Sequence, residues 1–187
     1  MIFVSFLKDV HLWFLCLCFQ VYLSFNNVSA LKMLAARSSW RLSCEKDQVQ
    51  LYTLEQKSML SFKIECEVDV PAHRAFDLLA ELSNRPSWDS HYNQSGKRIL
   101  QDFILLASKR KPCGSGQDPY VIALRSVSLP THPPTEGYNR GEVLCAGFTI
   151  LETKDNKSAT LTRYCRLSSS FYHTFCSCSQ YLTRNRL

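Results

Sequence analysis

The sequence lacks the short motifs that mark the common enzyme and nucleotide-binding classes. It contains no Gly-x-Gly-x-x-Gly, no P-loop, no Gly-x-Ser-x-Gly and no His-Glu-x-x-His. Only 6 glycines and 7 prolines occur in 187 residues, which excludes collagen-like and low-complexity chains, and no repeat of fixed period indicates a solenoid. The length suits one domain with a buried core, and we expect no catalytic residues in it.

The 9 cysteines lack the spacing of a metal site. The close pairs Cys16/Cys18 and Cys176/Cys178 are separated by one residue rather than two, and no pair of histidines completes a zinc set. Several other cysteines fall on apolar faces of expected strands, as small buried hydrophobes in a reducing compartment do. We therefore expect free thiols, no metal and no cofactor.

The charge is positive but not concentrated. The formal net charge is +6, and the only tight basic run is Lys109–Lys111, beside Pro112. No zinc-finger, homeodomain or RNA-recognition pattern is present, so we expect no nucleic-acid partner. A run this short is typical of a solvated loop edge, and phosphate or anionic-lipid binding is the alternative.

Residues 1–27 differ in composition from the rest of the chain. An apolar run covers Val10–Phe25, which is shorter than the about 20 residues of a membrane span. Lys8 before the run and Val28-Ser29-Ala30 after it resemble a signal peptide with its cleavage site, although Asp9 interrupts the basic flank. We treat residues 1–27 as an apolar leader of uncertain status.

Three glycosylation sequons begin at Asn27, Asn93 and Asn156, a mild excess over chance. We expect an unusual leader fused to an intracellular domain that covers residues 28–187, and hence a cytoplasmic protein. Secretion or membrane anchoring through residues 1–27 is the alternative.

The clearest elements are a strand and the helix that follows it. Apolar and polar residues alternate over ten positions that end before Pro71, which predicts a strand with one buried face: Phe62, Ile64, Cys66, Val68 and Val70. Apolar residues then recur every three or four positions from Ala72 to about Ser83, which predicts an amphipathic helix.

Similar patterns place the other elements. An earlier helix is predicted with Asn27 as its cap and Leu31, Leu34 and Ala35 on one face. A last helix is predicted from the apolar stripe of Phe171, Phe175, Cys178 and Leu182. Alternation predicts strands over 41–54, 102–109 and 120–129, and a hairpin of 141–153 with 158–166. This succession predicts an α+β fold in which the last helix covers an antiparallel sheet.

Arg125 is the unusual polar residue of this pattern. It lies in an apolar strand, on the face of Val121, Ala123 and Val127, where an unpaired charge is costly. One interpretation is a structural ion pair with Glu142 or Asp102. The other is a group that faces a ligand inside a cavity.

Several strings of residues resemble a known family. The strings are Arg85-Pro86-Ser87-Trp88-Asp89, Asp102–Pro112, Pro119–Val127 and Gly141–Phe148. In this order they resemble the START (StAR-related lipid transfer) domain, and more narrowly the C-terminal START domain of acyl-CoA thioesterases. The resemblance extends from about Val28 to Arg186.

The resemblance implies a helix-grip fold, with a curved antiparallel sheet, a long C-terminal helix and an apolar tunnel between them. A tunnel of this kind binds a lipid or fatty-acyl ligand, with transient membrane contact during exchange. The residues that we expect to line it are Phe103, Leu105, Arg125, Phe148, Phe171 and Phe175.

The chain also departs from the family. Nothing in it resembles the hotdog domains that carry out hydrolysis in the thioesterases, and two stretches of the family's domain are missing, one after Tyr92 and one after Arg166. We therefore expect a lipid-binding module that is not an enzyme by itself. The alternative is a regulatory fragment of an acyl-CoA thioesterase, acting in fatty-acid metabolism.

Overall fold

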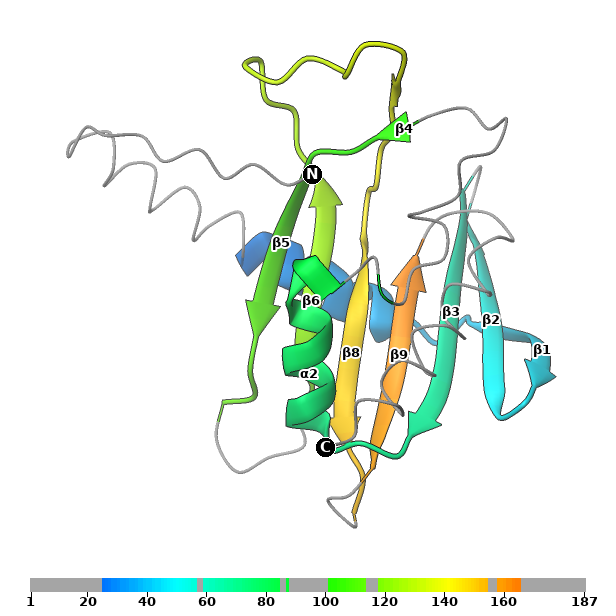
Figure 1. The fold of residues 1–187 in the computed structure, drawn as a ribbon. Coiled ribbons are helices and arrows are strands. Elements are labelled where there is room, and N and C mark those ends of the chain that lie inside the picture. The colour runs from blue at the N-terminus through cyan, green and yellow to red at the C-terminus, as the bar shows by residue number, and fades with distance from the viewer. Residues whose placement is uncertain are drawn as a thin grey trace.

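The fold is a seven-stranded antiparallel sheet with a helix on each face (Figure 1). The structure is a computed structural model, and it describes residues 25–56, 59–84, 87, 101–113, 118–154 and 158–165. In sheet order the strands are β1 (Arg41–Lys46), β2 (Val49–Gln56), β3 (Met59–Val68), β9 (Ala159–Cys165), β8 (Ala146–Glu152), β6 (Tyr120–Ser126) and β5 (Leu105–Arg110). The predicted α+β class is confirmed. Residues 166–187 lie outside the described residues, so the last helix stays a prediction.

Two shorter elements lie outside this sheet. Strands β4 (Gln101–Asp102) and β7 (Asn139–Arg140) form a two-residue parallel pair at one end of the molecule. A short 3-10 helix, η1 (Leu82–Asn84), follows the helix α2 (Ala72–Ala80). None of the helices in the described parts of the chain is long and apolar enough to cross a membrane.

Helix α2 covers one face of the sheet, called here the α2 face. Its apolar side buries Ala72, Ala75, Phe76 and Leu79, as the periodicity predicted, and also Ala80. The helix ends at Ala80 rather than at about Ser83. These residues pack against apolar side chains of the central strands, among them Ile64, Ile122, Phe148, Ile150 and Leu161. The predicted alternation of β3 is confirmed, because Ile64, Cys66 and Val68 are all buried in this cluster.

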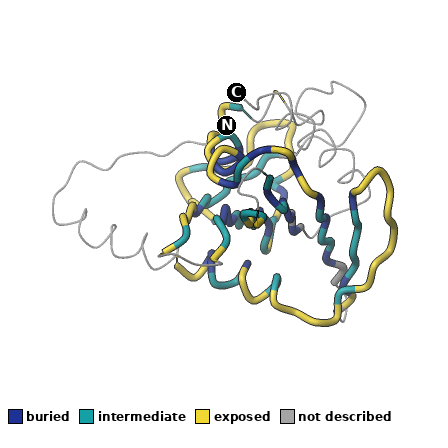
Figure 2. The backbone as a smooth tube through the Cα atoms, turned by 90° about the horizontal axis from the view of Figure 1, so that it is seen from below, coloured by how far each residue is buried: buried dark blue, intermediate teal, exposed yellow. Residues whose placement is uncertain are grey.

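Residues 25–35 are helical and cover the opposite face of the sheet. Leu31 is fully buried there with Val28, Val121, Ala123 and Tyr164. Figure 2 shows buried segments toward the middle of the molecule and exposed segments around its periphery. The sheet therefore lies between two separate apolar layers.

Gly147 of β8 allows this helix to approach the sheet closely. Its φ is +148°, a backbone conformation that L side chains rarely adopt. A Cβ atom at this position would meet the Ile122 carbonyl oxygen and would lie 3.0 Å from Leu31 Cδ2. Only glycine fits both the backbone angle and the contact with the helix.

Asn27 does not cap this helix, contrary to the sequence prediction. It lies within the helical residues and is only 1% exposed. Its Nδ2 donates to the Ala123 carbonyl (2.9 Å), to Ser108 Oγ (3.1 Å) and to the Leu106 carbonyl (3.3 Å). The side chain ties the helix to β5 and β6, so in the folded chain it is not accessible for glycosylation.

The region predicted as one strand over 41–54 is instead a hairpin of β1 and β2. Asp47 and Gln48 form its turn with φ values of 52° and 63°. A two-residue turn with both φ values positive matches the twist of the flanking strands. The prediction missed it because such turns normally contain asparagine or glycine, and glutamine gives no signal.

Candidate functional site

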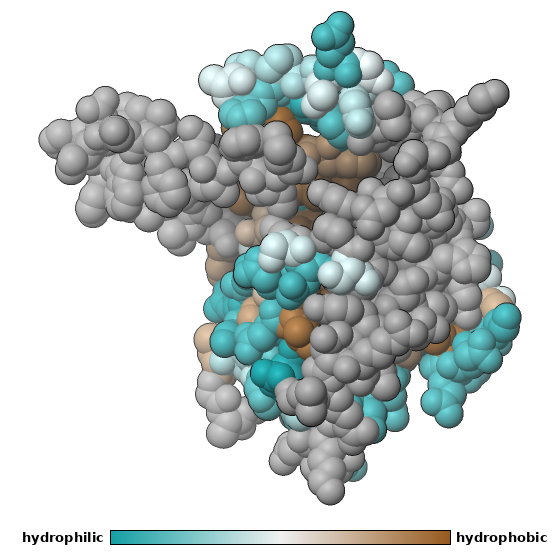
Figure 3. Space-filling view, viewed as in Figure 1, coloured by the Kyte–Doolittle hydropathy of each residue, from teal (hydrophilic) through white to brown (hydrophobic). Residues whose placement is uncertain are grey.

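The part of the α2 face that α2 leaves uncovered holds partly exposed apolar residues. In the strand register Ala107 of β5 lies opposite Leu124 of β6, and Leu105 lies opposite Ser126. Leu105, Ala107 and Leu124 are all intermediate in exposure. Figure 3 shows apolar surface (brown) in a recess between α2 and the β6–β8 loop, which comprises residues 127–145.

Phe148 and Phe103 lie close to this region. Phe148 of β8 is 5% exposed and belongs to the core cluster that contains Ile122 and Phe76. Phe103 lies between β4 and β5, with its ring against Gly141. A Cβ atom at position 141 would overlap that ring, so Gly141 leaves the space that Phe103 fills.

The sequence prediction grouped six residues around one tunnel, and the structure brings only some of them together. Leu105 and Phe148 both belong to the α2 face, because Leu105 shares its side of the sheet with Ala107, Leu124 and Ile122. Phe171 and Phe175 lie outside the described residues.

Arg125 lies on the other face of the sheet. It follows Val121 and Ala123 in the alternation of β6, and both of these pack beneath helix 25–35. Neither predicted ion pair is present among the described residues: Asp102 pairs with Arg140, and Glu142 is exposed. The sequence placed Arg125 on the side of Val121 and Ala123, and helix 25–35 packs on that side of the sheet.

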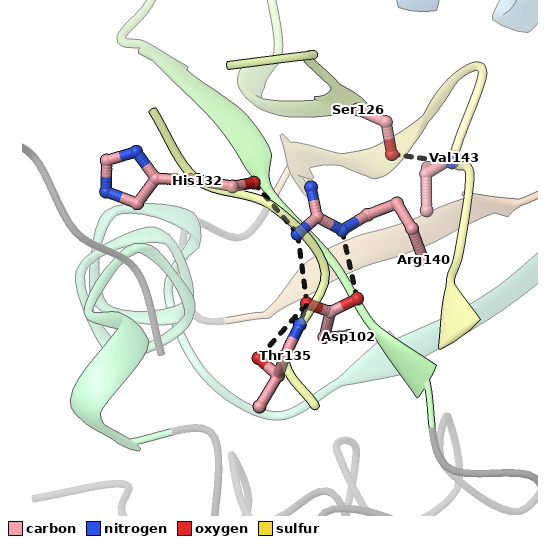
Figure 4. Close-up of polar contacts among 6 residues, drawn as sticks. All are labelled: Asp102, Ser126, His132, Thr135, Arg140 and Val143. Atoms are coloured by element: carbon pink, nitrogen blue, oxygen red, sulfur yellow. Dashed lines mark hydrogen bonds and ion pairs between the residues drawn. The ribbon is translucent and has the colours of Figure 1, made fainter. Parts of the chain in front are cut away.

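Asp102 and Arg140 hold the β6–β8 loop against the segment before β5 (Figure 4). Arg140 Nε donates to Asp102 Oδ1 (2.9 Å) and Arg140 Nη2 donates to Asp102 Oδ2 (3.0 Å), a bidentate pair. Asp102 Oδ2 also accepts from Thr135 N (2.9 Å) and Thr135 Oγ1 (3.2 Å). Arg140 Nη2 in turn reaches the His132 carbonyl (3.2 Å). We call Asp102, Arg140 and Thr135 the loop clamp.

Backbone contacts reinforce the loop clamp at both ends of the loop. Gly141 N donates to the Asp102 carbonyl (2.9 Å) and Ser126 N donates to the Val143 carbonyl (2.7 Å). Val143 N donates to Ser126 Oγ (2.8 Å). The loop is thereby fixed above the apolar recess, since its two ends and its middle are all hydrogen-bonded.

The stability that the loop clamp contributes depends on pH, because Asp102 must be ionised to accept its hydrogen bonds. The hydrogen bonds from Arg140 and from Thr135 lower the pKa of Asp102 well below its usual 3.8. A lowered pKa means that the clamp contributes its full stability above about pH 4 and loses it as the pH falls through the folded-state pKa. We expect Asp102→Asn to melt at a lower temperature than the wild type at neutral pH, with the gap shrinking below pH 3.8.

The measurement is thermal unfolding followed by circular dichroism between pH 2 and 8. Asp118→Asn is the control, because Asp118 forms a looser ion pair with Lys32 (3.7 Å) in which both side chains are exposed. We expect little change in melting temperature for this control. A gap for Asp102→Asn that stays constant down to pH 2 would contradict the assignment.

No sequence pattern indicated the loop clamp, because its ionic partners are 38 positions apart. It also missed Ala107 and Leu124. Both could have been found by extending the alternation from Leu105 and Ile122 along their strands. The described residues contain no group of three His, Cys, Asp or Glu that could hold a metal ion.

Comparison with known proteins agrees with this architecture. Residues 98–168 match the family model of the START domain. Human StAR-related lipid transfer protein 5 superposes with a TM-score of 0.71 at 14% identity, covering 90% of this chain and 97% of that chain. Human STARD10 superposes with a TM-score of 0.63 at 20% identity, covering 82% and 80%. Residues 98–168 belong to a START domain. The resemblance inferred from the sequence is confirmed.

Two mouse proteins are similar to this START domain chain in sequence. Acyl-coenzyme A thioesterase 11 is 43% identical over 202 residues, which cover 89% of this chain and 34% of the relative. Acetyl-coenzyme A thioesterase is 37% identical over 174 residues, which cover 82% of this chain and 31% of the relative. The START domain chain thus spans about a third of the length of these relatives.

Proposed function

We propose that this START domain chain binds a lipid or fatty-acyl chain on the α2 face of its sheet. The observation that carries the proposal is the set of partly exposed apolar residues on the α2 face, Leu105, Ala107 and Leu124. Figure 3 shows an apolar recess between α2 and the β6–β8 loop. Burial of an acyl chain there contributes about 0.8 kcal/mol per CH₂ group. We further propose that Phe103 and Phe148 contact the ligand, together with Phe171 and Phe175 of the predicted last helix.

The proposal also gives the β6–β8 loop a role. The exposed apolar side chains of this loop are Leu129, Tyr138 and Leu144. Exposed apolar groups at the mouth of a lipid site favour transient contact with a membrane surface, where the ligand is exchanged. The loop clamp holds these side chains in place during that contact.

Titration with a fluorescent fatty acid tests the site, and two neighbouring leucines provide a matched pair. Leu105 and Leu106 are both partly exposed but lie on opposite faces of β5. We expect Leu105→Gln to weaken binding about tenfold, because a polar amide replaces apolar contact worth about 1.5 kcal/mol. Leu106→Gln should leave the affinity within about twofold of wild type.

Two outcomes would contradict the proposal. The first is the absence of saturable binding by wild-type protein whose circular dichroism shows a folded sheet. The second is an equal effect of the two leucine substitutions, since that would place the ligand elsewhere.

A second candidate is a regulatory fragment of an acyl-CoA thioesterase, which the names of the two mouse relatives favour. We propose that this chain alone does not hydrolyse long-chain acyl-CoA. Assayed by thiol release, the folded chain should give the background rate. A rate above background that survives repurification would overturn this assignment.

We propose a cytoplasmic location. The exposed Cys44 and Cys113 form no disulfide within the described parts of the chain, and exposed thiols are typical of reducing compartments.

A further inference from the structure

Strand β5 is at one end of the seven-stranded sheet. It pairs with β6, and no other described strand lies along its outer side (Figure 1). Val127 N donates to the Ile104 carbonyl (3.0 Å), so the even-numbered residues of β5 exchange hydrogen bonds with β6. The N–H and C=O groups of the odd-numbered residues therefore point outward: Leu105, Ala107 and Lys109.

These outward groups form a template for one more strand. No hydrogen bond from another described residue satisfies them. An edge of this length can accept an extended segment, which gains affinity from main-chain hydrogen bonds and specificity from its alternate side chains. The charged residues beside the edge indicate which charge such a segment should carry.

The edge carries an excess of positive charge. Lys109, Arg110 and Lys111 are consecutive at its end, and Arg125 lies directly across from Leu106. On the α2 face acidic groups partly offset this charge, since Asp77 lies 3.6 Å from Lys111 and the charge of Lys109 acts on Glu81. On the other face, Arg110 and Arg125 form no salt bridge with any described residue.

We propose that the outer edge of β5 binds an extended acidic segment of a partner protein by strand addition. The main chain of the segment would pair with Ala107, and its acidic side chains would lie beside Arg110. Arg125, one strand further into the sheet, adds positive charge on the same face. A second copy of this chain lacks the complementary charge, because each copy carries the same +6 and the same basic run. The proposal does not require a bound lipid, although Leu105 and Ala107 belong to both surfaces: their main chains form the edge and their side chains lie on the α2 face.

A substitution at Ala107 tests the edge without disturbing the sheet. Because the Ala107 N–H points outward, Ala107→Pro removes one edge donor and keeps the ladder to β6. The probe is a fluorescein-labelled peptide that alternates glutamate and valine, followed by anisotropy with the full chain. We expect saturable binding that Ala107→Pro weakens about tenfold, while Ala107→Ser, which keeps the N–H, stays within about twofold.

Two further measurements test the contribution of charge and the location of the bound peptide. Arg110→Glu should also weaken binding, and hydrogen exchange should slow at the Leu105, Ala107 and Lys109 amides when the peptide binds. Equal affinity for the proline and serine variants, or protection elsewhere, would overturn the proposal. So would self-association that Ala107→Pro abolishes, which would make a second copy the occupant, or binding to anionic vesicles without binding to the peptide.

Discussion

Replacing Gly147 by alanine is expected to destabilise the fold by several kcal/mol. The added Cβ would collide with the Ile122 carbonyl oxygen and press on Leu31, and the φ of +148° is strained for any L side chain. Backbone strain costs about 1–3 kcal/mol and overpacking about 1–3 kcal/mol more. The sum of about 2–6 kcal/mol is a large part of the stability of a small domain, which is about 5–15 kcal/mol.

Gly137→Ala is the matched control. Gly137 also has a positive φ, of 78°, but a Cβ atom there would meet nothing within 4 Å. We expect it to cost only about 1 kcal/mol, the backbone preference alone. Urea unfolding followed by circular dichroism measures both variants, and equal stability of the two would show that Gly147 is not needed for the approach of helix 25–35.

Asn27→Asp is the second substitution with a large expected effect. The change keeps the size of the side chain but places a carboxylate oxygen where Nδ2 donates to the carbonyls of Ala123 and Leu106. An unpaired buried charge costs about 3–5 kcal/mol. Burial would raise the pKa of the new carboxyl in the folded state. The loss of stability should therefore grow as the pH rises above the pKa that this carboxyl has in the unfolded chain, and it should be small in acid.

Urea unfolding at pH 4 and pH 8 tests this prediction. Asn139→Asp is the control, since Asn139 is exposed on β7 and the same substitution there should change the free energy of unfolding by less than about 0.5 kcal/mol. An Asn27→Asp protein as stable as the wild type at pH 8 would contradict the role assigned to Asn27 as the tie between the helix and the sheet.

Local patterns predicted the elements whose neighbours in sequence are also their neighbours in space. The alternation of β3 and the periodicity of α2 were sufficient, because each depends on one buried face within a single element. The helix with Leu31 was predicted for the same reason. The hairpin turn at Asp47 and Gln48 was missed because its conformation is not the one that its residues prefer.

The site was predicted only in part, for a different reason. The sequence placed Arg125 on the side of β6 with Val121 and Ala123, but which helix covers which face of a sheet is decided by tertiary packing. Asp102 was considered as a partner of Arg125, and Arg140 takes that role from the β6–β8 loop. Hydrophobic periodicity describes single elements and does not show which distant segments pair with each other. These pairings were therefore found only in the structure.

The β1–β2 hairpin offers a practical attachment point. All six residues of β1 are exposed, so little of the stability rests on them, and the turn at Asp47 and Gln48 lies beyond the paired ends of both strands. A short epitope or a reporter dye introduced at this turn would sit away from both the apolar recess and the β5 edge. Such a handle would let each of the two surfaces be immobilised or imaged without obstructing either one.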